Sequence, residues 1–278
     1  MLPDPAAVLQ ELYESEPGNR FDDGDGCLFD PPVHAIADAA DPWFARLKEV
    51  IGEFHWSPQE ALALCDPSAT ARCVICWALP ISERARLANR PQKEMPSRDW
   101  AYVRTFGNGM VARMARRMEG RLRAMGFAAV APGVAPQNKV EERPRVSLSS
   151  CWSERHTAFV AGLGTFGLSG GLITARGIAH RLASVVTDAD LPATPRPYGD
   201  DPFAWCLRSA RDACGVCIGR CPSGSVRENV QERDKAACIR HVREVVAKRG
   251  REEFGWEGTY GCGLCQTGTP CEHHNPTE

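Results

Sequence analysis

The amino-acid sequence predicts an α+β protein in which a larger α/β domain precedes a small cysteine-rich domain. Eight of the 13 cysteines in this 278-residue chain fall between Cys206 and Cys271, after a proline-rich segment at 191–202. With 43% hydrophobic residues, the chain can bury one sizeable core and still carry a small appended domain. We therefore expect an N-terminal helical extension over residues 1–65, an α/β domain over 66–190 and the cysteine-rich domain over 191–278.

A strand is predicted at 73–79, where the apolar run CVICWAL ends at Pro80. Side chains alternate between the two faces of a strand, so Cys73 and Cys76 should point in opposite directions. We therefore interpret this Cys-x2-Cys pair as two buried thiols and not as a binding site.

A long helix is predicted from Ser97 to Gly126, because apolar side chains follow a helical stripe along this segment. The arginines between 113 and 123 are interpreted as its solvated face. A short strand at 127–130 should follow and end before Pro132. The members of the apolar stripe are Trp100, Val103, Met110, Met114, Met118, Leu122 and Met125.

A further helix should begin after Ser153 as its N-cap, and a glycine-rich segment follows at 162–171. This segment contains Gly-x-Gly-x-x-Gly, but a dinucleotide site needs a strand before the pattern and a helix after it. Here a helix precedes and strand-like residues 172–174 follow, and residues 180–188 predict a core strand. A tight structural turn is one interpretation; the other is close backbone approach to a flat ligand. The glycines concerned are Gly162, Gly164, Gly167 and Gly171.

The first cysteine block predicts iron–sulfur ligands. Its sequence, CGVCIGRCP at 214–222, has the spacing of the last three ligands of the bacterial ferredoxin pattern. The first ligand of that pattern would fall at Arg211, and Cys206 is the nearest thiol that could replace it. Soft thiolates suit such clusters, and short Cys-x2-Cys arcs let backbone N–H groups point at the cluster sulfurs.

A second block repeats the plan in stretched form, which makes two 4Fe–4S clusters the expected cofactors. In two-cluster ferredoxins the fourth cysteine of each run binds the other cluster. Applied to this chain, one cluster would take Cys206, Cys214, Cys217 and Cys271. The other would take Cys221, Cys238, Cys262 and Cys265.

Structural zinc is the main alternative for these cysteines, because paired Cys-x2-Cys motifs also bind zinc. Zinc sites seldom use a Cys-Pro ending or isolated cysteines such as Cys206 and Cys238. Disulfides are disfavoured because the sequence starts without an apolar signal peptide, so a reducing cytoplasmic location is expected. The net charge of −2 provides no basic footprint for nucleic acid, and no apolar run approaches the ~18 residues of a membrane span.

Taken together, four segments resemble the epoxyqueuosine reductase and reductive dehalogenase superfamily. They read SERHTAFVAGLGTFGLSGGLIT from Ser153, HRLASVVTDADLPATPRPY from His180, CGVCIGRCPSG from Cys214 and GCGLCQTGTPCE from Gly261. The resemblance implies a nitroreductase-like, corrinoid-binding α/β domain followed by a two-cluster ferredoxin-like domain. It also implies that the clusters pass electrons to a base-off corrinoid, a cobalamin, with the four glycines lining it.

Two departures separate this chain from epoxyqueuosine reductase. That enzyme keeps a catalytic aspartate about six residues before the Glu-Arg pair, whereas residues 146–153 read VSLSSCWS and contain no acid. The C-terminal helical-repeat module is also missing, which disfavours a tRNA substrate. For proton supply we consider His156, because histidine titrates near neutral pH, together with Cys151 and Tyr102. Glu154 and Arg155 are expected to form an ion pair at the start of their helix that braces the glycine-rich loop, and neither is expected to be catalytic.

The first functional hypothesis is a corrinoid-dependent iron–sulfur oxidoreductase that reduces a small-molecule substrate with electrons from a ferredoxin- or flavodoxin-type donor. The second is an electron-transfer or activating protein that donates to a partner enzyme and has no substrate chemistry of its own. The missing acid motivates the second hypothesis. The protein's part in the first is to position the substrate, supply protons and exclude side reactions.

Overall fold

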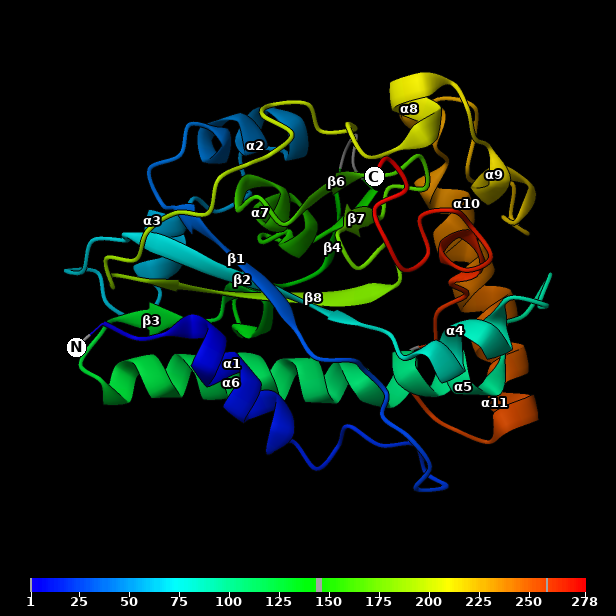
Figure 1. Ribbon diagram of the computed structural model, residues 1–278, viewed down its shortest axis with the longest axis horizontal. Coiled ribbons are helices and arrows are strands. Elements are labelled where there is room, and N and C mark those ends of the chain that lie inside the picture. The colour runs from blue at the N-terminus through cyan, green and yellow to red at the C-terminus, as the bar shows by residue number, and fades with distance from the viewer. Residues whose placement is uncertain (1, 144–146, 259) are drawn as a thin grey trace.

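The computed structural model describes residues 2–143, 147–258 and 260–278. Its centre is a four-stranded antiparallel sheet in the order β1 (Val33–Asp38), β2 (Cys73–Pro80), β8 (His180–Thr187) and β3 (Ala129–Val130) (Figure 1). Every residue of β2 is buried, because β1 and β8 pair with its edges and helices cover its faces. The strands predicted at 73–79 and 180–188 are confirmed.

Helices cover both faces of the sheet and give the molecule three layers (Figure 1). One layer contains α1 (Pro5–Glu14), α5 (Arg98–Tyr102) and α6 (Asn108–Ala124), and the other contains α2 (Trp43–Ile51), α3 (Pro58–Leu62) and α7 (Glu154–Val160). Cys73 joins the hydrophobic core on the α6 side, whereas Cys76 joins the core on the α7 side. The predicted separation of these two thiols is therefore confirmed, and burial raises the pKa of Cys73 to about 12.

Residues 1–65 pack into the same body as the rest of the chain. β1 forms the edge of the central sheet, and α1 buries Leu9 and Leu12 in the core below it. On the opposite face, α2 and α3 bury Leu47 and Leu62. A six-residue strand with only partial burial, such as β1, has too weak a periodicity to be recognised from sequence.

The long helix predicted after Ser97 is a continuous helical run with a π-helical segment in it. α5 leads into the π-helix η1 (Val103–Gly107), and α6 follows directly. All members of the apolar stripe are buried except Met125, which is 45% exposed where the helix ends. A π-helical turn takes an additional residue, and such turns are frequent at functional sites.

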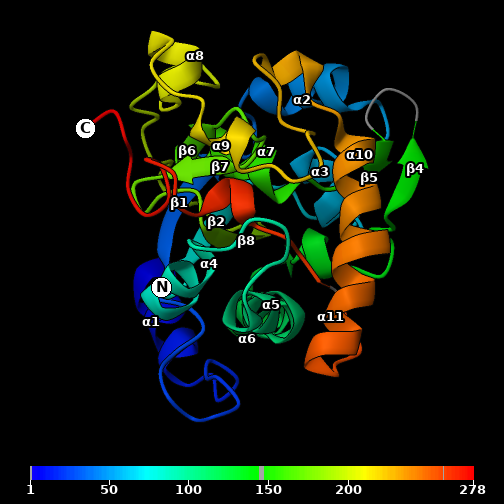
Figure 2. The ribbon, with the colours of Figure 1, turned by 90° about the vertical axis from the view of Figure 1, so that its right-hand side faces the viewer.

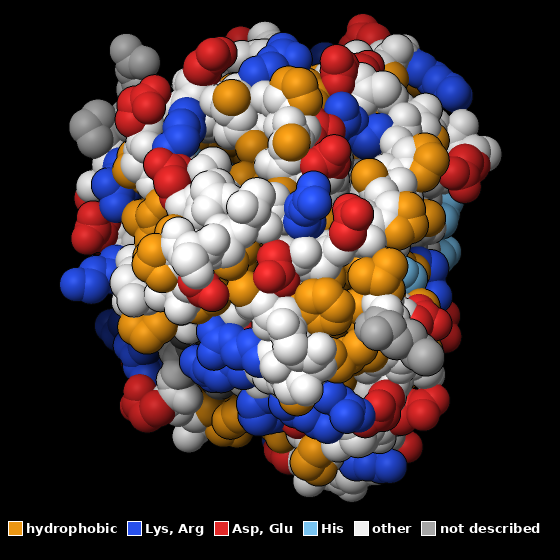
Figure 3. Space-filling model, turned by 90° about the vertical axis from the view of Figure 1, so that its left-hand side faces the viewer, with side chains coloured by type: hydrophobic (Ala, Val, Ile, Leu, Met, Phe, Trp, Pro, Cys, Tyr) orange, Lys and Arg blue, Asp and Glu red, His pale blue; other side chains and the backbone are white. Residues whose placement is uncertain are grey.

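The arginine-rich face of α6 lies at the surface and takes part in ion pairs. Arg113 binds Glu16 at 2.7 Å, and Arg123 binds Glu119 at 2.8 Å. Figure 3 shows acidic and basic side chains interspersed over one face of the molecule. No helix in the part of the chain that the structure describes has the length and apolar character needed to cross a membrane.

Two small hairpins flank the region between α7 and the sheet. β6 (Gly164–Phe166) pairs with β7 (Leu172–Thr174), so the glycine-rich segment is a hairpin, and β4 (Glu141–Arg143) pairs with β5 (Ser147–Ser149). A 3-10 turn, η2 (Pro132–Val134), follows β3.

The cysteine-rich part consists of short helices and turns packed against one end of the sheet. α10 (Lys235–Arg240), the π-helix η4 (His241–Val246) and α11 (Ala247–Phe254) form one continuous helical column (Figure 2). The chain then returns to the core, where the backbone N–H groups of Ile178 and Ala179 donate to the carbonyl groups of Cys271 and Glu272 at 2.8 and 3.2 Å. The remaining short elements are α8 (Leu207–Arg211), α9 (Val216–Gly219), η3 (Val230–Glu232) and η5 (Leu264–Gln266).

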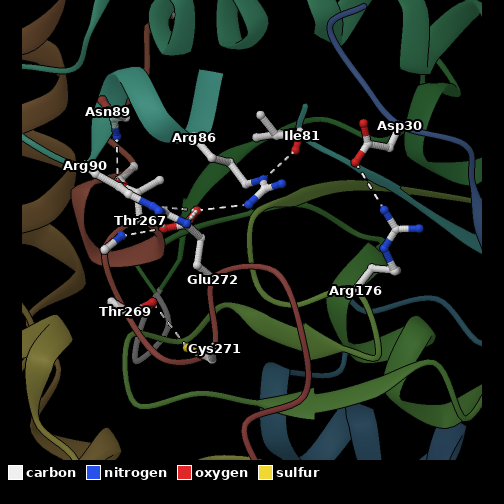
Figure 4. A network of polar contacts seen from close by, with 12 residues as sticks. Asp30, Ile81, Arg86, Asn89, Arg90, Arg176, Thr267, Thr269, Cys271 and Glu272 are labelled. Atoms are coloured by element: carbon white, nitrogen blue, oxygen red, sulfur yellow. Dashed lines mark hydrogen bonds and ion pairs between the residues drawn. The ribbon is translucent and has the colours of Figure 1, made fainter. Parts of the chain in front are cut away.

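The buried carboxylate of Glu272 attaches this last segment to α4 (Glu83–Asn89) (Figure 4). It accepts hydrogen bonds from Arg86 Nη1 at 3.1 Å, from Arg90 Nη2 at 2.9 Å and from the backbone N–H of Gly268 at 2.6 Å. The side chain is only 1% exposed. Burial alone would raise the pKa of Glu272, but the two arginines and the Gly268 N–H lower it below its usual value.

Replacing Glu272 by glutamine should destabilise the protein by about 3 kcal/mol, because it leaves two arginines without their buried counter-charge. The measurement is the free energy of unfolding in urea, followed by tryptophan fluorescence under anaerobic reducing conditions. The control is Glu11→Gln, which removes the exposed ion pair to Arg121 and should cost below about 1 kcal/mol. Equal losses in the two variants would contradict a supporting role for Glu272.

Candidate iron–sulfur and reduction site

The structure gathers the eight C-terminal cysteines into two neighbouring groups. Burial and the charges of the other three thiols of its group raise the pKa of Cys217 to about 12. The pKa of Cys265 is also raised to about 12, first by burial and then by the charges of Cys262, Cys238 and Cys221. Group A consists of Cys206, Cys214, Cys217 and Cys271, and group B consists of Cys221, Cys238, Cys262 and Cys265. Each group contains the four cysteines that the crossover pattern predicts. Cys271 joins three cysteines of the first block, and Cys221 joins three cysteines of the second.

Among the described residues, no three His, Cys, Asp or Glu side chains form a set that could hold a single metal ion. Each thiolate of a cubane cluster binds a different iron, so the four sulfurs stand apart around a common centre. Each group has four thiols, the number of thiolate ligands that a cubane cluster takes.

Each group borders its own cavity, and the two cavities meet at Cys265. Group A lines a small apolar cavity together with Ile173 and Ile178. Group B lines a cavity of about 460 Å³ that lies between the cysteine-rich part and the first strand residues of β8. Cys265 lines both cavities, so the groups are adjacent.

Close backbone packing positions the group B loop against the π-helix η1. A Cβ atom at Gly263 would overlap the indole ring of Trp100, and one at Gly261 would lie 2.9 Å from Arg104 Cγ. Gly263 also has a φ of +65°, which glycine adopts readily. From the other side, Arg220 donates from Nε to the carbonyl oxygen of Leu264 at 2.8 Å, so its guanidinium holds the loop.

The glycine-rich hairpin is packed mainly against the protein's own atoms. A Cβ at Gly162 or Gly164 would meet a carbonyl oxygen of a neighbouring segment, and one at Gly167 would meet two isoleucine side chains. Of the four glycines assigned to a flat ligand, Gly171 alone lines the group B cavity. The structural-turn interpretation therefore accounts for the other three.

The three residues considered for proton supply are not brought together. His156 lines other cavities, its Nδ1 lies 2.7 Å from Ser153 Oγ, and burial lowers its pKa to about 3. Cys151 Sγ lies 3.8 Å from Arg143 Nη2, while Tyr102 packs in an aromatic cluster. Among the described residues that line the group B cavity, none of the three is present. Sequence spacing could not reveal this, because each residue lies on a different segment.

The side chains of Glu154 and Arg155 bind different partners, so the expected ion pair between them is wrong. Glu154 lines the group B cavity and accepts a hydrogen bond from Ser184 Oγ at 2.6 Å, whereas Arg155 donates to the carbonyl oxygen of Gly170. Burial raises the pKa of Glu154 to about 7, although Ser184 and Trp152 lower it. A carboxyl that titrates near neutral pH is suited to proton transfer. Glu154, the first residue of the Glu-Arg pair, is the one carboxyl among the described residues that line this cavity.

The sequence analysis missed the arginines of the group B cavity. One signal was present: Arg181 is the only charged residue in the strand β8. The others lie on helices or turns where a charged residue is unremarkable. The four that line the cavity are Arg104, Arg155, Arg181 and Arg233.

The fold is one that occurs in reductases. It is the α+β core of epoxyqueuosine reductases, and it extends over most of this chain. The structure of the Bacillus subtilis epoxyqueuosine reductase has a TM-score of 0.53 and 18% identity, and covers 96% of this chain and 65% of that one. An epoxyqueuosine reductase solved with a tRNA-Tyr stem loop gives the same values. The predicted resemblance is therefore confirmed at the level of the fold.

A catabolic reductive dehalogenase is similar as well, with a TM-score of 0.51 and 12% identity. The alignment covers 96% of this chain but 36% of the dehalogenase, and the chain spans about two thirds of the epoxyqueuosine reductases. No protein-family model and no curated protein sequence matches the chain. At these identities the comparisons show a shared fold.

The raised pKa of Glu154 predicts a pH-dependent stability. The folded state keeps its proton up to about pH 7, whereas the unfolded chain loses it near 4.5, so stability falls as the pH rises between these values. Relative to Glu154→Gln, the parent should lose roughly 3 kcal/mol between pH 4.5 and 7.5. The measurement is the difference in unfolding free energy between parent and variant across this range. Ser184→Ala removes a hydrogen bond that lowers the pKa, so it should shift the loss to higher pH; a pH-independent difference would contradict the assignment.

Proposed function

We propose that this protein is an iron–sulfur reductase in which groups A and B each hold one 4Fe–4S cluster. The observation that supports this most strongly is the combination of group B with a cavity that also contains a buried carboxyl of raised pKa, Glu154. Electrons from an external donor of the ferredoxin or flavodoxin type would enter at group A. They would continue to group B past Cys265, which borders both cavities.

The cavity at group B is the proposed place of reduction. Its volume of about 460 Å³ lies within the range of small-molecule sites. Two electrons delivered one at a time, together with two protons, would reduce a bound substrate, and Glu154 would supply one of the protons. Arg155 and Arg233 lie close to the group B thiols and would stabilise the extra negative charge of the reduced cluster.

The corrinoid that the sequence resemblance implies does not fit the residues present. A corrinoid is larger than the drug-sized ligands that pockets of this volume hold, and the group B cluster would itself occupy part of the space. Four arginines line the cavity, and backbone atoms fill the approach to Gly162 and Gly164. We therefore propose that the substrate takes electrons directly from the group B cluster, without a corrinoid between them.

Electron transfer to a partner enzyme is the second candidate function. The short helices α8 and α9 beside group A contain no buried residue, so this side of the cysteine-rich part is accessible to a redox protein. Oxidation of the clusters only in the presence of a co-purified partner would favour this function. Reduction of a small molecule by the isolated protein would exclude it.

Anaerobically purified protein, expressed with cobalamin supplied, should contain about eight irons and eight sulfides per chain and no stoichiometric cobalt. Iron, sulfide and cobalt analysis with an optical spectrum provides the measurement. A colourless protein with zinc as its only metal would contradict the cluster assignment. One cobalt per chain would contradict the conclusion that a corrinoid does not fit.

Pairs of cysteine variants should reveal the crossover between the two blocks. Cys214→Ala and Cys271→Ala should each lose about four irons, and combining them should lose no more, because both remove ligands of group A. Combining Cys214→Ala with Cys221→Ala should lose about eight irons, although both residues belong to the first block. The reverse pattern of iron contents would show that each block binds its own cluster.

A further inference from the structure

Positive charge is concentrated in the group B cavity. Among the described residues that line it, Glu154 is the single carboxylate, while four arginines are present. Burying a guanidinium group without a counter-charge is costly, so an anion is expected wherever such groups cluster. The four arginines form two pairs with different surroundings.

The first pair, Arg155 and Arg233, lies within the field of group B. Burial and the neighbouring Arg233 lower the pKa of Arg155 to about 10, and the nearby Cys238 opposes that shift. Arg233 likewise opposes the rise that burial causes in the pKa of Cys265. Arg155 also donates to the carbonyl oxygen of Gly170. The group B thiolates and their cluster therefore provide the counter-charge for this pair.

Among the described residues, no carboxylate or thiolate acts on the second pair, Arg104 and Arg181. Burial and the neighbouring Arg104 lower the pKa of Arg181 to about 9, and burial lowers the pKa of Arg104 as well. Arg181 donates from Nη1 to the carbonyl oxygen of His180 at 3.0 Å, but its buried Nε has no hydrogen-bond partner among the described residues.

A further donor with free hydrogen-bonding capacity lines the same end of the cavity. Trp100 is 1% exposed, and its indole Nε1 has no partner among the described residues. His241 Nε2 also lines the cavity without a partner among the described residues, but the neutral ring already donates to the carbonyl group of Glu94, so Nε2 is an acceptor. A buried donor such as the Trp100 indole N–H is normally satisfied, so its partner here is expected to be a ligand.

The backbone is irregular at two of these positions. Arg104 lies in the π-helix η1 and His241 in the π-helix η4, two segments far apart in the sequence that both border the cavity. π-Helical turns are costly and frequently occur at functional sites. Gly261 and Gly263 bring the Cys262 loop against Arg104 and Trp100, which places these donors next to a group B thiol.

We propose that Arg104 and Arg181, with the indole N–H of Trp100, bind an oxyanion, the carboxylate or phosphate group of the substrate. His241 borders the site at its η4 side. This inference rests on the proposed reductase function and adds a substrate class: a small anionic molecule held with its reducible part towards the group B cluster. Guanidinium groups suit this role because they bind carboxylates and phosphates through paired, charge-assisted hydrogen bonds.

Calorimetric titration of the cluster-containing protein tests the site with inorganic phosphate and succinate as separate probes in low-salt buffer. At least one probe should bind, and Arg181→Gln and Arg104→Gln should each weaken it by roughly tenfold to a hundredfold. Arg116→Gln is the matched control, because it removes one positive charge from the exposed face of α6. The probe that binds distinguishes a phosphate from a carboxylate substrate.

Equal affinities in the cavity variants and in Arg116→Gln would overturn the site, as would no binding of either probe. Stoichiometric binding of hydroxocobalamin would also overturn it, because the cavity would then serve a cofactor. Iron content and the electron paramagnetic resonance spectrum of the reduced protein are recorded on the same samples. If the probe binds and depends on the arginines but the protein contains no iron, the proposed reductase function is wrong and the oxyanion site stands. If the clusters are intact but no arginine-dependent binding is found, the oxyanion site alone is wrong.

Discussion

The buried carboxylate of Glu272 is the contact on which the arrangement of the two cysteine groups depends. It follows Cys271 directly in the sequence and is held by Arg86, Arg90 and the N–H of Gly268. Cys271 is the member of group A that comes from the far end of the chain. Backbone hydrogen bonds from Ile178 and Ala179 hold the same segment, and Glu272 adds its attachment to α4, which helps to keep that thiol beside Cys206, Cys214 and Cys217. Hydrogen bonds from three residues to one carboxylate compensate for its desolvation, so the interaction can both stabilise and position.

The same segment determines how the group B cavity is closed. The loop from Gly261 to Gly268 lies between α4 and the π-helix η1, and Arg220 holds its middle through the Leu264 carbonyl group. Because the glycines at 261 and 263 have no side chains, the backbone beside Cys262 comes directly against Trp100 and Arg104. A larger residue at either position would move the thiol away from the donors of the cavity. Cluster ligand and proposed substrate group are thus positioned by one stretch of backbone.

The apolar patterns of the sequence were sufficient to predict individual strands and helices. β2 and β8 follow from their apolar runs, and the helical stripe from Trp100 to Leu122 follows from its spacing. The site itself depends on tertiary neighbours. Glu154 is an ordinary first-turn carboxylate in sequence, and its pKa is raised only because the fold buries it. His156, two residues later, is turned towards other cavities. Likewise, only packing reveals that the hairpin glycines accommodate the protein's own backbone.

Charge balance connects these observations. Two clusters ligated by thiolates bring negative charge to the interior, and each one-electron reduction adds more. Arg155 and Arg233 compensate at group B, and Arg104 and Arg181 add further positive charge to the same cavity. An anionic substrate would neutralise that surplus, but it would also oppose the arrival of an electron from the reduced cluster. A protonated Glu154 eases this conflict, because transfer of its proton as one electron arrives leaves the charge of the substrate itself unchanged.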